Sequence, residues 1–385
     1  MNRVKRIGFL FLVLLIWSSW TSLQAKEWDP RLIQAMELSF SGFPENAEPL
    51  IQTYVKEKPL DPNGLFILAM VLEWKYGLSG RNHHRAYLDL EKIYKQANRM
   101  AFHLWEKNPE DVNALINLGN SYFLLARIYA KRGSILKAGL TGKKSQKHLQ
   151  KALEKDSSRL DALVAVGAFN YFAGKTPKFW EPIKRMFGIK GDKDQGLAQL
   201  QRAGTGNHPY AWNAKYALLE IYSNPEKKYQ KAMGILADFE EAFPQNPVVP
   251  LKRAWILEKQ EPLRGARAYL DFAENCSVKY ASCQPKLKTF AYSQAGKVFL
   301  EAGKYLEAQH WLVKSLEVDP KNYPDLTAKI YLWQGEAAKN GGQATTALNY
   351  YQQAAQVPGV SKKIAREVKK TRREACRQKE FSGKC

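Results

Sequence analysis

The sequence has few of the residues and none of the motifs that usually mark an enzyme. Its 385 residues include only six histidines and four cysteines. His83 and His84 are adjacent, so on a helix they would point apart. The chain contains no H-E-x-x-H, G-x-S-x-G or P-loop pattern, and its cysteine spacings do not fit a zinc site. We therefore expect a non-catalytic protein without a metal, a cofactor or a small-molecule substrate.

Long apolar runs are absent after the first 25 residues. Arg3, Lys5 and Arg6 precede an apolar run at 7–17, which is shorter than the roughly 20 residues needed to span a bilayer. A polar segment follows and ends at Ala25, a suitable cleavage site. We predict that residues 1–25 are an export signal and that the protein is periplasmic in a Gram-negative bacterium. An uncleaved signal that anchors the chain is the alternative.

Acidic residues are scarce relative to basic ones. The chain has 37 Asp and Glu against 59 Lys and Arg, a formal charge of +22. The predicted signal carries three of these cations, so the mature chain keeps +19. Such an excess attracts polyanions without selecting among them. Outside the cytoplasm these are chiefly lipid headgroups and envelope polymers, and export disfavours nucleic acid as a natural partner.

All four cysteines lie beyond residue 270, and an even number in an oxidising compartment indicates disulfides. Three connectivities are possible. The short separations favour two local loops, Cys276 with Cys283 and Cys376 with Cys385.

A helical repeat organises the rest of the chain. Residues 292–320, YSQAGKVFLEAGKYLEAQHWLVKSLEVDP, match the tetratricopeptide repeat (TPR) pattern, in which small residues lie where two antiparallel helices touch. Equivalent second-helix positions recur at 54, 104, 152, 203, 239, 273, 315 and 354. The residues that define the repeat include Gly119, Gly167, Gly196, Ala203, Ala266, Gly296, Ala308, Pro320, Gly335 and Ala347. We predict an all-α fold, an α-solenoid of about eight TPR-like helix pairs wound as a right-handed superhelix.

The first four units are longer than the ideal 34 residues. In the third and fourth repeats the extra residues fall near the inter-helix turns, at about 131–145 and 174–191. We divide the mature chain into an N-terminal half (26–210) with these inserts, a C-terminal TPR half (211–360) and a basic tail (361–385). Insertions of this kind map to one face of a solenoid, often the binding face.

The stretch FGIKGDKDQGLAQL, residues 187–200, has the glycines and aspartates of a phosphate or calcium loop. The repeat assigns them structural roles instead. Asp192 is predicted to cap a helix, Gly196 to lie at a helix crossing, and Gly188 to end a short preceding helix. We therefore interpret the stretch as the start of a helix.

Residues 160–222 also carry a family resemblance. LDALVAVGAFNYFAG, GIKGDKDQGLAQLQRA and WNAKYALLEIY follow one another. The chain resembles an exported bacterial TPR family and, over about residues 90–245, the tetratricopeptide-repeat-39 and inclusion-body-clearance family. The matching residues are Gly167, Asn170, Tyr171, Gly191, Asp192, Gly196 and Leu197, while Lys190 replaces the first glycine of the family's G-G-D element. The resemblance implies an α-solenoid without known catalytic residues and implies no particular ligand.

The second insert is the first candidate for partner binding. Phe179, Trp180 and Phe187 supply an apolar stripe, and Lys184 and Arg185 supply charge. This combination suits an anionic membrane surface or an acidic partner. Alternatively, the aromatic side chains fold back as a lid over the repeat.

The concave groove of the solenoid, lined by first helices, is the second candidate. The residues expected to be exposed there are Asn117, Asn120, Tyr171, Asn213, Lys252 and Arg253. Such side chains can hold the backbone or carboxylates of an extended peptide. We therefore predict a scaffold of the cell envelope that binds proteins or peptides through its groove and inserts. A peripheral binder of anionic lipid or glycan, using the second insert, is the alternative.

Overall fold

The structure, a computed structural model, is all-helical wherever it describes the chain. It describes residues 28–79, 83–206, 208–319 and 323–377. The predicted signal peptide, Pro320 and Cys385 lie outside these ranges. Within them the chain forms 18 α-helices and one 3-10 helix, with no strand. None of the described helices is both long and apolar enough to cross a bilayer.

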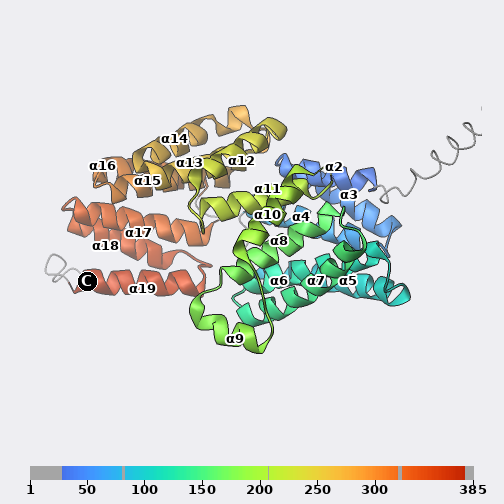
Figure 1. Cartoon of the computed structure of the whole chain (residues 1–385). Helices are drawn as coiled ribbons and strands as arrows, with labels where there is room; N and C mark the ends of the chain where they lie inside the picture. Colours follow the sequence, from blue (N-terminus) through green and yellow to red (C-terminus); the bar gives the residue numbers. More distant parts are fainter. Residues whose placement is uncertain (1–27, 80–82, 207, 320–322, 378–385) are drawn as a thin grey trace, which may run out of the picture.

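Eight consecutive helix pairs make up most of the molecule (Figure 1). The pairs are α2 (Pro30–Phe40) with α3 (Pro44–Glu57), α4 (Pro62–Ser79) with α5 (His83–Lys107), α6 (Val112–Lys131) with α7 (Ile135–Lys155), α8 (Leu160–Gly174) with α10 (Lys193–Thr205), α11 (Ala211–Ser223) with α12 (Tyr229–Ala242), α13 (Val248–Gln260) with α14 (Pro262–Lys279), α15 (Pro285–Glu301) with α16 (Tyr305–Val318), and α17 (Pro324–Asn340) with α18 (Ala344–Gln356). Each pair packs against the next, and α19 (Lys362–Cys376) packs on α17 and α18. The predicted fold class, an α-solenoid of helix pairs, is confirmed.

Small residues allow the two helices of a pair to approach closely. A Cβ added at Gly196 would lie 2.4 Å from the backbone nitrogen of Tyr171, and one at Gly167 would lie 2.9 Å from the carbonyl oxygen of Gly196. Cβ atoms at Gly119, Gly296 and Gly335 would likewise lie within 2.7 Å of a side chain on the second helix of their pair. Ala203, Ala266, Ala308 and Ala347 are fully buried. As predicted, Asp192 caps α10 by accepting the backbone N–H of Gln195 at 2.8 Å.

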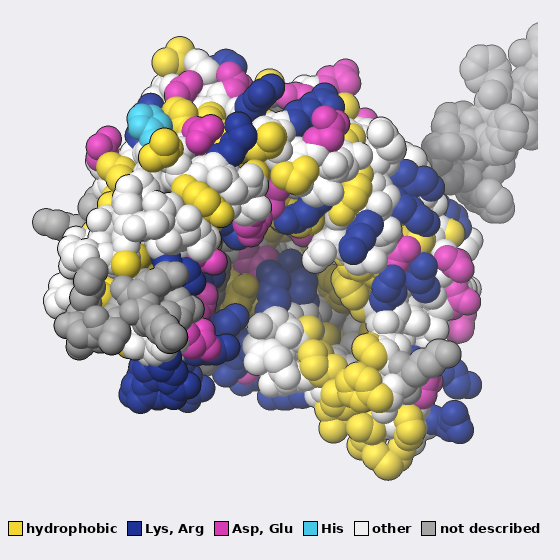
Figure 2. Space-filling model, turned by 90° about the vertical axis from the view of Figure 1, so that its left-hand side faces the viewer, with side chains coloured by type: hydrophobic (Ala, Val, Ile, Leu, Met, Phe, Trp, Pro, Cys, Tyr) yellow, Lys and Arg dark blue, Asp and Glu magenta, His cyan; other side chains and the backbone are white. Residues whose placement is uncertain are grey.

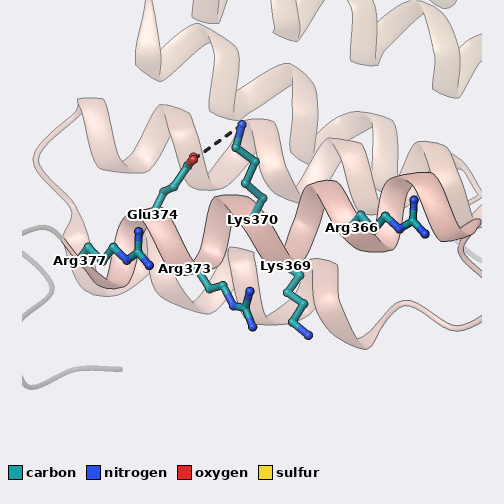
Figure 3. Close-up of a pocket in the computed structure, with 6 residues that line it drawn as sticks. All are labelled: Arg366, Lys369, Lys370, Arg373, Glu374 and Arg377. Atoms are coloured by element: carbon teal, nitrogen blue, oxygen red, sulfur yellow. Dashed lines mark ion pairs between the residues drawn. The ribbon is translucent and has the colours of Figure 1, made fainter.

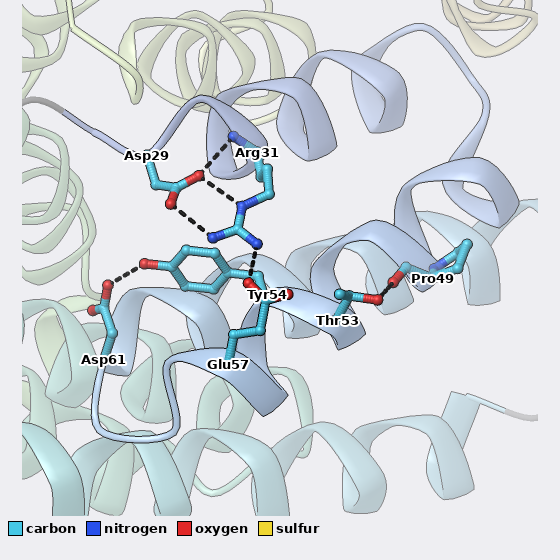
Figure 4. Close-up of polar contacts among 7 residues, drawn as sticks. All are labelled: Asp29, Arg31, Pro49, Thr53, Tyr54, Glu57 and Asp61. Atoms are coloured by element: carbon cyan, nitrogen blue, oxygen red, sulfur yellow. Dashed lines mark hydrogen bonds and ion pairs between the residues drawn. The ribbon is translucent and has the colours of Figure 1, made fainter.

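A network of polar contacts secures the first repeat (Figure 4). Asp29 caps α2 and pairs with Arg31 at 3.0 Å. The Arg31 guanidinium also reaches Glu57 at the end of α3 and lies over the Tyr54 ring, 4.9 Å from its centroid. The Tyr54 hydroxyl donates to Asp61 at 2.6 Å. These contacts tie the start of α2 to the end of α3 and to the loop that follows.

One of the two predicted disulfides lies within the described residues and is confirmed. Cys276, in the last turn of α14, is bonded to Cys283 in the loop before α15, with their Cα atoms 5.7 Å apart. The second predicted pairing involves Cys385, which lies outside the described residues.

The two inserts adopt different structures. The first lengthens α6 and α7 to 20 and 21 residues, and these helices meet at a tight turn where Gly133 has a φ of +79°. The second forms the 3-10 helix η1 (Lys178–Trp180) and α9 (Glu181–Met186). The inserts touch, because Lys143 on α7 donates to the carbonyl oxygen of Phe187 at 2.9 Å. A Cβ at Gly139 of α7 would likewise meet Ile189 at 2.9 Å.

The solenoid closes on itself through contacts between distant repeats. The Phe40 ring at the end of α2 packs among Trp74, Phe239 and Phe243, with ring centroids 5.5 to 6.1 Å away. The Asn246 side chain donates to the carbonyl oxygen of Phe40 at 2.7 Å. The two predicted halves therefore share a core across residue 210.

Candidate functional site

The molecule is hollowed at its centre, and Lys and Arg side chains lie deep in the hollow (Figure 2). Charged side chains on α4, α6, α11 and α13 interact: Arg127 pairs with Glu73, and Glu220 pairs with Lys252 and acts on Lys131. The Tyr216 ring of α11 lies 5.9 Å from that of Trp74 on α4, and the charges of Glu73 and Arg127 act on its hydroxyl. We call these residues the inner cluster: Glu73, Arg127, Lys131, Tyr216, Glu220, Lys252, Trp255 and Lys259.

Arg127 is the centre of the α4–α6 side of the inner cluster. Its guanidinium contacts the Glu73 carboxylate at 2.6 Å and the Tyr94 hydroxyl at 3.2 Å. The Lys131 amine lies 3.7 Å from the same carboxylate. Two cations therefore pair with one carboxylate, so this side of the hollow has an excess of positive charge.

Lys131 is enclosed and still reachable by solvent. Burial lowers the pKa of its amine, and the neighbouring Arg127 charge acts in the same direction. The side chains of Arg127 and Lys131 nevertheless remain 35% and 41% exposed. These cations are partly shielded from water and still accessible. An anion that enters the hollow would therefore interact with them more strongly than with lysines on a convex surface.

The α13 side of the inner cluster combines cations with an indole ring. Lys252 pairs with Glu220 of α11 at 2.7 Å. The amines of Lys252 and Lys259 lie 4.9 and 5.5 Å from the centroid of Trp255. Lys259 also pairs with Glu258 at 2.7 Å, so each lysine of this side has a carboxylate partner beside the indole ring.

Lys286, on α15, is another cation with a perturbed pKa. Burial lowers its pKa to about 8, and its amine donates to the carbonyl oxygen of Gly77 on α4 at 2.8 Å. The contact joins the second repeat to the seventh.

The structure separates the six residues predicted to line the groove. Lys252 belongs to the inner cluster. Asn213 donates to the sulfur of Met70 at 3.6 Å, and Arg253 pairs with Glu240. Asn117 and Asn120 are half-buried on α6.

Tyr171 departs from the expected exposure, because it is fully buried. Its hydroxyl donates to Glu226 at 2.7 Å. The physical reason is that α8 is apolar around most of its circumference and is packed between α7, α10 and α11, so it has little surface left for the hollow.

Sequence reasoning missed Glu73, Arg127 and Tyr216. A signal was present, since Glu73 is the only acidic residue in α4 and Arg127 interrupts an apolar stretch of α6. A charge inside an otherwise apolar helix needs a partner, and here the partner comes from the neighbouring repeat. Which residue pairs with Glu73 could be seen only in the folded structure.

The second insert presents its predicted residues unequally. Phe179 is 73% exposed, whereas Trp180 and Phe187 are half-buried. Lys184 is held by Glu181 at 2.7 Å, and Arg185 is exposed. We call the exposed part, Phe179, Arg185 and the 71% exposed Met186, the insert tip.

Comparisons with known proteins give similarities at the level of helical repeats. No family model matches the sequence, and no curated protein matches it. The yeast Tom70 crystal structure aligns with 98% of this chain and 88% of its own, at 14% identity and a TM-score of 0.43. A tetratricopeptide repeat protein from Parabacteroides merdae aligns with 90% of this chain and 100% of its own, at 11% identity and a TM-score of 0.37. A human IFIT1 dimer with PPP-AAAA aligns with 83% of this chain and 69% of its own, at 15% identity and a TM-score of 0.43. With TM-scores below 0.5, these similarities support no statement about what this chain binds.

Proposed function

We propose that the protein is a non-catalytic scaffold of the cell envelope that binds an acidic segment of a protein or peptide partner in its central hollow. The observation that carries the proposal is the excess of positive charge in the inner cluster, where Arg127 and Lys131 share the single carboxylate of Glu73. The resemblance to the tetratricopeptide-repeat-39 family is a separate hypothesis, on which this proposal does not depend.

The chemistry of the inner cluster fits carboxylates of an extended chain. Charge-assisted hydrogen bonds from Lys and Arg to carboxylates are shorter and stronger than neutral ones. Trp255, flanked by Lys252 and Lys259, offers an apolar surface beside the charges. A peptide with alternating acidic and apolar side chains would use both features.

Location in the envelope rests on two observations. The first 25 residues have the pattern of an export signal. The disulfide between Cys276 and Cys283 is of the kind that persists in oxidising compartments. Both support an exported protein that works outside the cytoplasm.

The proposal is tested with the chain that begins at Lys26 and a fluorescent oligoglutamate peptide. We expect the peptide to bind, and the double variant K131Q/K252Q to bind it at least about tenfold more weakly, because two cations of the hollow are lost. Neither substitution changes Arg127, which can still pair with Glu73. Fluorescence anisotropy measures the affinities.

Two controls make the result specific. The variant K147Q removes an exposed lysine of α7, outside the inner cluster, and is expected to bind like the unaltered chain. An oligoglutamine peptide is expected not to bind. Equal affinity of K131Q/K252Q and the unaltered chain for oligoglutamate would refute the proposal.

A further inference from the structure

The helix α19 carries a continuous basic surface. Its buried side chains are Ile364, Val368 and Ala375, which pack on the last repeat. All its Lys and Arg residues, and the one that follows it, are exposed: Lys362, Lys363, Arg366, Lys369, Lys370, Arg372, Arg373 and Arg377. Glu367 and Glu374 are the only acidic residues in this segment. The exposed face of α19 therefore has far more positive charge than α19 can itself neutralise.

Several of these side chains form an open cavity of about 370 Å³ (Figure 3). Lys370 lies 3.8 Å from Glu374, and the two side chains are 76% and 58% exposed. Lys369 and Arg373 are exposed and lie together on the other side of α19 from this pair in Figure 3. They are thus available to an anionic surface outside the fold.

The insert tip supplies apolar side chains that the fold does not cover. Phe179 and Met186 are 73% and 71% exposed, and the Phe179 ring lies against Trp180 with centroids 5.4 Å apart. Arg185 and Lys190 are exposed beside them. Large apolar side chains at a protruding tip with basic neighbours are typical of segments that enter the interface of a membrane.

The fold brings α19 and the insert tip to the same side of the molecule. In Figure 1 α19 and α9 both lie along the lower side of the molecule, and Figure 2, turned about the same vertical axis, shows a basic patch and an apolar tip along that side. In Figure 2 the basic patch and the apolar tip are the two ends of that side. A flat surface placed below the molecule would meet both.

We propose that this lower side docks the protein on an anionic lipid bilayer. The cations of α19 supply long-range attraction, and Phe179 and Met186 enter the interfacial layer at the insert tip. A soluble polyanion would neutralise the positive charge of α19 but would leave the apolar side chains of the insert tip exposed to water. The bilayer is the occupant whose chemistry matches both features, and the hollow stays free for a partner.

The test is co-sedimentation of the chain that begins at Lys26 with vesicles of phosphatidylglycerol and phosphatidylcholine, against vesicles of phosphatidylcholine alone. We expect binding to the anionic vesicles only. One unit of charge near such a surface changes binding about fivefold. The variant K369E/R373E is therefore expected to lose at least about tenfold, and F179S/M186S a comparable amount.

Matched controls come from α14, which lies at the upper side of Figure 1. Arg264 and Arg267 are exposed there, and Val278 is 88% exposed. R264E/R267E repeats the charge reversal, and V278S repeats the loss of an exposed apolar side chain. Both are expected to bind the vesicles like the unaltered chain, and circular dichroism checks that all variants fold.

Three results would overturn the proposal. The first is an equal loss of vesicle binding in the α14 controls, which would mean that only the net charge of the protein determines binding. The second is unaltered vesicle binding by F179S/M186S, which would mean that the insert tip does not enter the membrane interface. The third is no binding to anionic vesicles by the unaltered chain. K131Q/K252Q is expected to bind vesicles normally, so this test and that of the hollow can fail separately.

Discussion

Glu226, in the loop between α11 and α12, connects a side chain of α8, the residue that follows α8, and the first residue of α10. Its carboxylate accepts from the Tyr171 hydroxyl at 2.7 Å, the Lys175 amine at 2.8 Å and the Lys193 amine at 3.0 Å. The side chain is only 6% exposed. These partners, Lys175 foremost, lower the pKa of Glu226 to about 2. At the residue scale, this carboxylate fixes the two ends of the second insert to the body of the solenoid.

We predict that Glu226→Gln lowers the free energy of unfolding by about 1–3 kcal/mol at neutral pH, because charged hydrogen bonds in a nearly buried site are lost. The folded pKa lies below the ordinary value of 4.5. The contribution of Glu226 is therefore fully present above pH 4.5 and is lost as the pH falls toward about 2.

Urea unfolding at neutral pH and at pH about 3 measures both effects. The difference between Glu226→Gln and the unaltered chain is expected to shrink at the lower pH. Glu301→Gln is the control, since Glu301 is 59% exposed and pairs with Lys297 four residues earlier. Its effect is expected to stay below about 0.5 kcal/mol. A pH-independent difference for Glu226→Gln would contradict the assigned role.

At the scale of elements, two glycines within helices have opposite environments. Gly196 of α10 lies against the backbone of α8, where an added Cβ would meet Tyr171 and Gly167. Gly234 of α12 is exposed, and no atom outside the adjoining backbone of α12 lies within 4 Å of an added Cβ. One glycine allows a helix crossing, and the other merely lowers helix propensity.

We therefore predict opposite signs for the same substitution. Gly196→Ala is expected to lower the free energy of unfolding by about 1–3 kcal/mol, because backbone atoms of α8 must move. Gly234→Ala is expected to raise it by about 0.5–1 kcal/mol through helix propensity and lower chain entropy. Denaturant unfolding measures both. The packing argument fails if Gly196→Ala leaves stability unchanged.

At the scale of the whole molecule, the contact of the first repeats with the middle ones distinguishes this chain from an open solenoid. Ordinary solenoid repeats touch only their sequence neighbours. Here Phe40 of the first repeat lies in a buried aromatic cluster with residues of the fifth. This closure also brings the α4–α6 side of the hollow opposite α11 and α13.

We predict that Phe40→Ala lowers the free energy of unfolding by about 3–5 kcal/mol, since a large side chain that is only 3% exposed is removed from a packed cluster. It should also increase hydrogen exchange in α2, α4 and α12 together, because these helices share the cluster. Phe172→Ala is the control, because Phe172 is 56% exposed. If Phe40→Ala increased exchange in α2 alone, the closure would not couple the repeats.

Much of the fold was predictable, and the candidate site only partly so. The spacing of small residues, such as Gly296 and Ala308, predicted which helices form a pair. This was possible because the residues at a close helix contact lie near one another in the sequence of a repeat. Lys252 lies in the inner cluster, whereas Tyr171, which was expected to be exposed, is buried. The first insert was expected near a turn, whereas it extends two helices, since an insertion of helix-forming residues can continue the helices on both sides.

The sequence by itself determined the all-α class, the pairing of neighbouring helices, the cap at Asp192 and the local disulfide between Cys276 and Cys283. All of these depend on residues close together in the chain, whose spacing is visible in one dimension. Only the tertiary structure decided that Phe40 meets Phe239, that Glu73 is shared by Arg127 and Lys131, and that α19 and the insert tip share a side. Those relations depend on the small rotation between successive repeats, which accumulates along the solenoid and which no single repeat encodes.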